Sequence, residues 1–358
     1  DILVDDLILC GAIEADPLTD ITKEESGETF ALVDQLPKRF LHKPESVLRV
    51  YQIREDGMVV EYAEGTDYTI DYDRGTIRRT ENSSIPNYVD HQVTYDESGK
   101  FTRIREDGNE NPQSNRSYQI MVDYTYRVPE SELEDLSDQS ALLSSAVRSK
   151  LQNGGKLNIT LCGDSPGAGA DDMDADGSFL DELAKTLEET YGVAVDTKDL
   201  SVQGRGRELL TENLPQILEE RPDILLIRFG MMDHCLPDAS SEEALAGFTS
   251  EIESAVAALQ EHQIDVILMG FAQQNITLDV EDVSSSLLYN DALREIAQRK
   301  GVYFADVYNT FSRVGNIKPL SRDVYVDYVS EPANWGQRLY LSSLLEVFNI
   351  EDRLRTER

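Results

Sequence analysis

The sequence contains few cysteines and few basic residues. Three cysteines in 358 residues are too few and too scattered for a disulfide framework. Lys and Arg together number 33 against 68 Asp and Glu, which gives a formal net charge of −35. Because nucleic acids and anionic membranes would repel such a chain, we expect neither as a partner.

Long apolar runs are also missing. No segment approaches the roughly 18 consecutive apolar residues of a membrane span, so we expect no membrane insertion. The first residues, DILVDDLILCGAI, have acidic flanks and do not resemble a secretory signal. The carboxylates show no metal-ligand spacing with His or Cys, so we expect no metal and no other cofactor. The chain length predicts two domains.

The first third of the sequence has the pattern of antiparallel strands. Asp56-Gly57 separates two β-rich runs, which is a strong hairpin signal. The expected strands are Val47–Arg54, Met58–Tyr62, Tyr68–Tyr72, Thr76–Arg79, Val89–Tyr95 and Tyr118–Val128. We therefore expect a small antiparallel β-sandwich over residues 30–128, preceded by an irregular acidic arm over residues 1–29.

Tyrosines are concentrated in these strands and permit two interpretations. Their rings either line a sugar-binding or protein-docking surface, or lie half-buried as tyrosines in strands commonly do. The phrase EGTDYTIDYDRGTI resembles segments of β-sandwich modules in phage tail and fibre proteins. That resemblance implies that residues 30–128 are a docking domain of a larger assembly.

The rest of the chain alternates strands with helices. Residues 129–156 are expected to form a helical linker that closes on an Asn-Gly-Gly turn. Strands are expected at Leu157–Cys162, Val193–Val202, Asp223–Phe229, Asp265–Phe271 and Val302–Val307. Helices are expected after Ser178, over Arg207–Glu220, Ser241–Gln260 and Ser284–Lys300, and from Asn334 to about Phe348. This alternation predicts an α/β domain over residues 157–358, with a doubly wound parallel sheet between two helical layers.

Four segments follow strands or precede the last helix, at the sheet edge where a ligand site is expected. They are Gly163–Gly169 (GDSPGAG), Ser201–Gly206 (SVQGRG), Phe229–His234 (FGMMDH) and Asp327–Tyr340 (DYVSEPANWGQRLY). In this order and spacing they resemble the four blocks of the SGNH/GDSL hydrolases, a family of esterases and sugar-O-deacetylases. The resemblance covers roughly residues 157–349 and implies a flavodoxin-like three-layer fold.

The resemblance also implies roles for individual residues. Ser165 matches the nucleophile, and Gly204 matches the glycine whose amide helps to form the oxyanion hole. Asp327 matches the acid, although it lies one residue early for the commonest spacing. Met232 occupies the position of the oxyanion-hole asparagine, and Glu331 occupies that of the histidine base.

The last two departures affect the chemistry. Methionine has no strong donor for a developing oxyanion, and losing one such donor costs about 10²–10³ in rate. Glu331, with a usual pKa near 4, is a poor base for a serine hydroxyl. His234 on the same rim is the available substitute base if it reaches Ser165; the alternative is that it is a polar loop residue.

These observations predict a catalytically impaired SGNH-like domain in a structural or adhesive protein of a virion, such as a phage fibre, tail or capsid decoration. Residues 1–128 would then join the chain to copies of itself or to other virion proteins, at the virion surface or outside the cell. The SGNH-like domain would bind a carbohydrate or another cell-surface ligand. The alternative is an active serine esterase or carbohydrate O-deacetylase that acts on cell-surface glycans.

Overall fold

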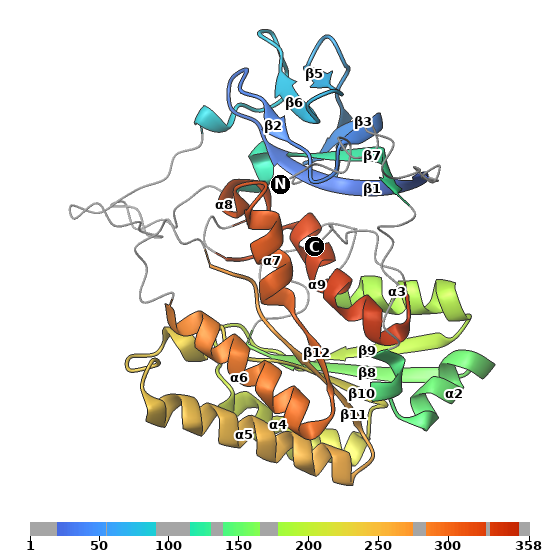
Figure 1. Cartoon of the computed structure of the whole chain (residues 1–358), viewed down its shortest axis with the longest axis vertical. Coiled ribbons are helices and arrows are strands. Elements are labelled where there is room, and N and C mark those ends of the chain that lie inside the picture. Colours follow the sequence, from blue (N-terminus) through green and yellow to red (C-terminus); the bar gives the residue numbers. More distant parts are fainter. Residues whose placement is uncertain are drawn as a thin grey trace, which may run out of the picture.

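A computed structural model describes residues 20–54, 56–90, 115–129, 139–164, 178–274, 284–326 and 330–350. Antiparallel strands from the first third of the chain lie at one end of the molecule, and a parallel sheet flanked by helices lies at the other (Figure 1). Between them lie the helices α8 (Leu320–Asp323) and α9 (Asn334–Leu345). We refer to the antiparallel part, residues 20–129, as the β module.

The β module contains two antiparallel sheets. The first consists of β1 (Asp20–Ala31), β7 (Gln119–Pro129), β3 (Pro44–Ile53) and β4 (Val59–Glu61), in that order. The second consists of β2 (Lys38–Arg39), β6 (Thr76–Arg79) and β5 (Tyr68–Asp71). Phe30, Val50 and Tyr124 from the first sheet share one buried cluster with Tyr68 and Ile77 from the second. This common core confirms the predicted small β-sandwich.

Two predictions for the β module were wrong. Residues 20–29 belong to strand β1 rather than to an irregular arm, and residues 1–19 lie outside the described residues. The strand could not be recognised from the sequence, because the buried positions Glu25 and Glu28, on either side of a bulge, are charged and the apolar alternation is lost. In place of a strand beginning at Val89, Tyr88–Asp90 form a 3-10 turn; residues 91–95 lie outside the described residues.

The parallel sheet has five strands. They are β8 (Lys156–Gly163), β9 (Ala194–Asp199), β10 (Ile224–Arg228), β11 (Asp265–Met269) and β12 (Tyr303–Ala305). Their spatial order is β9-β8-β10-β11-β12, with parallel pairing throughout. Numbered from the first strand of this sheet, the order is 2-1-3-4-5, which is the flavodoxin-like order and confirms the predicted fold class.

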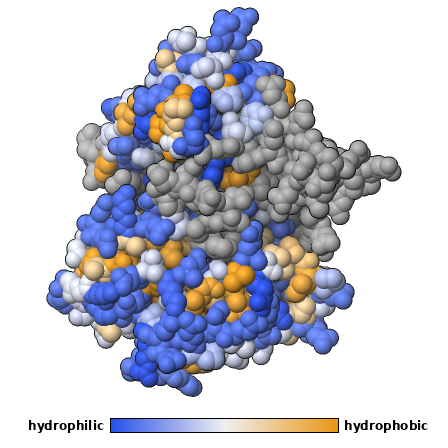
Figure 2. Space-filling model, turned by 180° about the vertical axis from the view of Figure 1, so that it is seen from behind, coloured by the Kyte–Doolittle hydropathy of each residue, from blue (hydrophilic) through white to orange (hydrophobic). Residues whose placement is uncertain are grey.

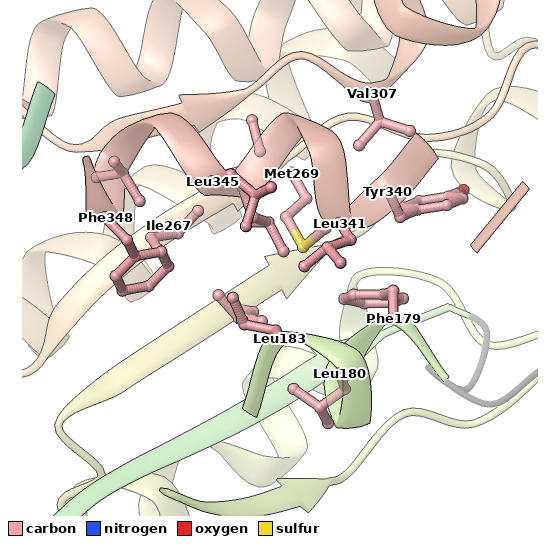
Figure 3. Close-up of a cluster of buried hydrophobic side chains, with 14 of the residues drawn as sticks. Phe179, Leu180, Leu183, Ile267, Met269, Val307, Tyr340, Leu341, Leu345 and Phe348 are labelled. Carbon is pink, nitrogen blue, oxygen red and sulfur yellow. The ribbon is translucent and has the colours of Figure 1, made fainter. Parts of the chain in front are cut away.

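Helices cover both faces of this sheet. One face carries α4 (Glu208–Glu220), α5 (Glu242–Glu261) and α6 (Ser284–Lys300). The other carries α2 (Ser145–Asn153), α3 (Phe179–Tyr191) and α9. Figure 3 shows how Phe179 and Leu183 of α3 face Tyr340 and Leu345 of α9 over Ile267 of β11. These side chains are removed from water, and burying each contributes about 1.5–3 kcal/mol to the stability of the fold.

The region predicted as a linker contains a helix that packs on the sheet. Ser144 caps α2 by accepting a hydrogen bond from the Val147 amide, and Val147 and Leu151 join the same core as Leu157 of β8. Lys150 forms an ion pair of 2.6 Å with Asp223 at the start of β10. Helices α7 (Val307–Gly315) and α8 were not predicted; both are short, and α7 begins directly after the edge strand β12.

In the part of the chain that the structure describes, no helix is both long enough and apolar enough to cross a membrane. Among the coloured residues of Figure 2, hydrophilic ones cover most of the surface, and hydrophobic ones form smaller groups between them. The surface is therefore largely polar on this side, as the high acidic content predicts.

A buried ion pair joins the β module to the α/β part. Lys318, between α7 and α8, lies 2.5 Å from Glu28 of β1, and their side chains are 2% and 0% exposed. The Lys318 ammonium also donates to the Thr29 carbonyl at 2.8 Å, and the Tyr124 hydroxyl donates to Glu28 at 2.6 Å. Burial nevertheless raises the pKa of Glu28, because desolvation outweighs the attraction of Lys318. The loss of hydration at each of these two charges is therefore offset by the other charge and by the hydrogen bonds around them.

We expect Lys318→Met to lower the free energy of unfolding by about 3–5 kcal/mol, because it leaves Glu28 buried without its cation. Lys198→Met is the matched control. Lys198 pairs with Glu220 at 2.6 Å, but both side chains are about 40% exposed, so the loss should stay below about 1 kcal/mol. Urea unfolding measures both variants. Equal losses in the two variants would contradict this account of the interface.

Candidate active site at the carboxyl edge of the parallel sheet

The candidate site lies where the order of the parallel strands reverses. Strand β8 pairs with β9 on one side and β10 on the other, and open α/β sheets bind ligands beyond the carboxyl ends of such strands. Gly163 ends β8 so close to β10 that an added Cβ would lie 2.6 Å from the Arg228 carbonyl oxygen. Glycine is therefore required here for the first predicted block to reach the sheet edge.

Asp164 joins three of the four predicted blocks. Its buried carboxylate accepts hydrogen bonds from the amides of Met231 at 2.9 Å and Met232 at 3.2 Å. Its backbone carbonyl accepts from the Gly204 amide at 3.0 Å. No role was predicted for Asp164, although it lies in the Gly-Asp-Ser motif of the first block. Relative to the end of β8, its carboxylate fixes the segment that follows β10, and its carbonyl fixes the segment that follows β9.

The electrostatics of Asp164 reflect its burial. Desolvation raises the pKa of this carboxyl to about 6, while the nearby Arg228 guanidinium and the two backbone donors oppose the rise. Arg228 is itself buried, and its guanidinium carbon lies 5.4 Å from the Phe179 ring centroid and 5.2 Å from that of Tyr340. A cation thus lies beside the carboxylate under the candidate site. The sequence offered one signal for this buried cation, because Arg228 is the only charged residue in the apolar run ILLIR.

The predicted oxyanion-hole positions are both engaged within the protein. The Gly204 residue adopts φ +79°, and its amide donates to Asp164 rather than into open space. The Met232 amide donates to the same residue, and its thioether offers no N–H group. A substrate oxygen would have to share or replace these hydrogen bonds. The oxyanion role of Gly204 stays a prediction.

Residues 324–326 and 331–333, on either side of positions 327–329, pair with each other beside α8, and we call these paired residues the Glu331 turn. Val326 donates its amide to the Glu331 carbonyl at 2.7 Å, and Ala333 donates to the Val324 carbonyl at 2.7 Å. The Glu331 side chain is partly exposed on this turn. Ser165 and Asp327, predicted as nucleophile and acid, lie outside the described residues, and their roles stay predictions.

His234 lies in apolar packing. It is buried, with its ring stacked on Phe271 at a centroid distance of 5.5 Å, and its carbonyl accepts from the Ser285 hydroxyl at 3.0 Å. Burial lowers the pKa of His234 to about 4, so the imidazole is neutral near pH 7 but only weakly basic. These surroundings favour the structural alternative stated for His234, and its role as a substitute base stays a prediction.

The neighbouring Asp233 is held by an ion pair. Arg207, which precedes α4, lies 2.7 Å from its carboxylate and 3.2 Å from Glu251 of α5. Asp233 therefore links the third block to the helical layer and is engaged in structure. Among the residues that the structure describes, no group of three or more His, Cys, Asp or Glu side chains is placed to hold a metal ion.

Residues 161–325 match the family model described as the GDSL-like Lipase/Acylhydrolase family. The C-terminal part of the chain therefore contains a GDSL/SGNH hydrolase domain, as the four blocks predicted. The match ends before Glu331, the residue at the histidine position. No curated protein matches the sequence. The resemblance of the β module to phage proteins stays a prediction.

Solved structures similar to part of the chain include enzymes with related folds. The acetylxylan esterase Axe2 from Geobacillus stearothermophilus is 18% identical with a TM-score of 0.47, covering 57% of this chain and 99% of its own. A putative GDSL-like lipase from Parabacteroides merdae is 15% identical with a TM-score of 0.46, covering 56% and 99%. The assignment of the domain depends on the family match and the strand order rather than on these likenesses.

We expect His234→Phe to reduce the acid sensitivity of the fold. A histidine whose folded pKa lies below its unfolded value contributes stability that is present above pH 6.5 and lost as the pH falls toward 4. Between pH 7 and pH 5 that loss amounts to about 2 kcal/mol, and phenylalanine removes it while keeping an aromatic ring against Phe271.

Urea unfolding at several pH values measures this effect. His42→Phe is the parallel case in the β module, because burial also lowers the pKa of His42 to about 4 and its ring stacks on Tyr126. A pH dependence of His234→Phe that superimposes on that of the parent chain would show that the imidazole is not held neutral.

Proposed function

We propose that the C-terminal domain is a GDSL-type hydrolase that cleaves small acyl esters of carbohydrates, with Ser165 as its nucleophile. The observation that carries the proposal is Asp164, whose carboxylate and carbonyl bind the blocks after β9 and β10 together at the strand-order reversal. Asp164 lies at the sheet edge where α/β folds hold their ligands, and Ser165 is the next residue in the sequence, which supports its assignment as the nucleophile. The family match over residues 161–325 supports it independently.

In the proposed reaction the Ser165 oxygen attacks the ester carbonyl carbon and its proton passes to a base. Collapse of the tetrahedral intermediate expels the sugar alcohol, which takes up that proton, and water then hydrolyses the acyl-enzyme. We assign the base to Glu331, with Asp327 beside it in the chain. Because a carboxylate is a weak base and Met232 supplies no side-chain donor, we expect slow turnover.

A second candidate is a ligand-binding domain that has lost hydrolysis. The engaged Gly204 amide favours it, since this predicted oxyanion donor already has a protein acceptor, and Met232 has no N–H group in its side chain. Under this candidate the chain is a structural or adhesive virion protein whose domain retains a carbohydrate or cell-surface ligand. Residues 1–128 would hold it in an assembly of identical or other virion proteins, at a virion surface or outside the cell.

We expect the purified chain to hydrolyse p-nitrophenyl acetate and acetylated xylo-oligosaccharides slowly, and Ser165→Ala to abolish both activities. The variant removes the hydroxyl that forms the acyl-enzyme. The measurement is initial rate against substrate concentration, with thermal unfolding as the control for folding. Activity that survives in Ser165→Ala would rule out the proposed nucleophile. Absence of activity in the parent chain would favour the second candidate.

We expect Met232→Asn to increase kcat about tenfold or more, because an asparagine amide restores a donor where the oxyanion develops. The backbone amide at this position should keep its hydrogen bond to Asp164. Met231→Asn serves as the matched control, since Met231 binds the same carboxylate through its amide but does not occupy the asparagine position. Equal effects of the two substitutions on kcat would contradict the family alignment of this block.

A further inference from the structure

The β module provides hydrogen-bond donors to the segment that precedes the last predicted block. Asn115 is fully buried, and its side-chain amide donates to the carbonyls of Ser321 and Tyr325, each at 2.7 Å. Its backbone amide donates to the Val326 carbonyl at 2.8 Å. The side-chain oxygen of Asn115 accepts from the Tyr88 hydroxyl at 3.0 Å, so a second residue of the module orients the amide.

Gln119 and strand β1 extend this contact. The Gln119 side-chain amide donates to the Arg322 carbonyl at 2.8 Å and the Tyr325 carbonyl at 3.1 Å. The Ala31 amide donates to the Asp323 carboxylate at 2.9 Å, and the Thr29 hydroxyl donates to the Asp323 carbonyl. The main-chain carbonyls of Ser321, Arg322, Asp323 and Tyr325 thus find hydrogen-bond donors in the β module. Without the module these buried carbonyls would lose their donors, which costs about 1–3 kcal/mol each.

The hydrogen bonds continue from this segment to Glu331. Val326 accepts from Asn115 through its carbonyl and donates through its amide to Glu331. Ala333 donates to Val324 on the same turn, and Tyr325 and Pro332 form a bridge between them. On the far side, Trp335 donates its indole N–H to Glu25 of β1 at 3.0 Å. The β module therefore binds the chain on both sides of the Glu331 turn, through residues 321–326 before it and Trp335 after it.

We propose that Asn115 and Gln119 of the β module are positioning residues for Glu331, the residue to which we assign the base of the hydrolase site. The module is then a component of the site, in addition to any docking role. This inference rests on the proposed function for the identity of the reaction. The positioning of the turn itself can be measured without any substrate.

The acceptors of these donors distinguish a positioning role from simple attachment of the two parts. Ion pairs such as Lys318–Glu28 already join the two parts. Asn115 and Gln119 bind instead to main-chain carbonyls, which fixes backbone geometry over residues 321–326 and not only the approach of two surfaces. A displacement of about 1 Å in a catalytic group can cost on the order of a hundredfold in rate. Loss of these donors should therefore affect turnover more than substrate binding.

The test compares Asn115→Asp with Gln52→Glu. Asn115→Asp keeps the size of the side chain but removes the two N–H donors. Gln52 is a matched buried amide inside the module: it donates to the Ser117 carbonyl at 2.9 Å and accepts from the Tyr62 hydroxyl at 3.0 Å. The first readout is hydrogen exchange at the amides of Val326 and Ala333, and the second is the split between kcat and KM for p-nitrophenyl acetate.

For Asn115→Asp we expect exchange at these two amides to increase at least tenfold, kcat to fall ten- to a hundredfold, and KM to change less than twofold. Gln52→Glu should leave all three values within twofold of the parent chain. If Asn115→Asp does not fold, Gln119→Glu removes the donor to Arg322 and Tyr325 and takes its place in the comparison.

The two readouts separate this inference from the proposed function. Unchanged exchange at Val326 and Ala333 overturns the positioning role whatever the activity. Increased exchange with unchanged kcat overturns it as well, because the turn would then not control the reaction. If the parent chain hydrolyses no ester, the proposed function fails, and exchange alone decides whether the module holds the turn.

Discussion

The arrangement of this molecule depends on charges that are buried between its two parts. Glu28 and Lys318 are both removed from water, which is favourable only if each finds close partners. The β module supplies further partners for both groups: Tyr124 and the Leu41 amide bind the carboxylate, and the Thr29 carbonyl binds the ammonium. The aromatic rings of Phe30 and Trp335 lie at 3.8 and 4.7 Å from the ammonium nitrogen. Separation of the β module from the α/β part would therefore leave Glu28 and Lys318 without several of their partners at once.

A second carboxylate organises the candidate site. Asp164 lies at the strand-order reversal, where it binds two amides after β10 and one after β9. The elevated pKa of this group and the neighbouring Arg228 cation indicate a site whose electrostatics are set by burial rather than by exposed charge. In the part of the chain that the structure describes, these contacts join the segments after β8, β9 and β10 within the α/β part. The last block is held from the β module as well, so both parts contribute to the geometry of the edge.

Much of the fold could be predicted because apolar residues mark buried strands and helix faces. The run ILLIR and the alternation around Asp56-Gly57 each predicted the element that the structure contains. Strand β1 escaped prediction because Glu25 and Glu28 are buried there, and burial of a carboxylate depends on partners far along the chain. A local pattern cannot encode a partner such as Trp335, which follows Glu25 by 310 residues.

The same limit applies to the site. The order of the four blocks identified the positions of Gly204, Met232 and Glu331, because a motif keeps its residue types at fixed spacing. It could not reveal that the Gly204 amide already has an acceptor, or that Asn115 supports the turn of the last block, since these are contacts between distant segments. The chemical groups available at the site could be predicted from the residue types. The hydrogen bonds that these groups form could not.

The central claim is that the β module and the hydrolase domain form one cooperative unit through this polar interface. Differential scanning calorimetry of the intact chain tests it most directly, because independent domains melt in separate transitions. We predict one transition whose calorimetric enthalpy equals its van't Hoff enthalpy. Two resolved transitions, or a calorimetric enthalpy about twice the van't Hoff value, would contradict the claim.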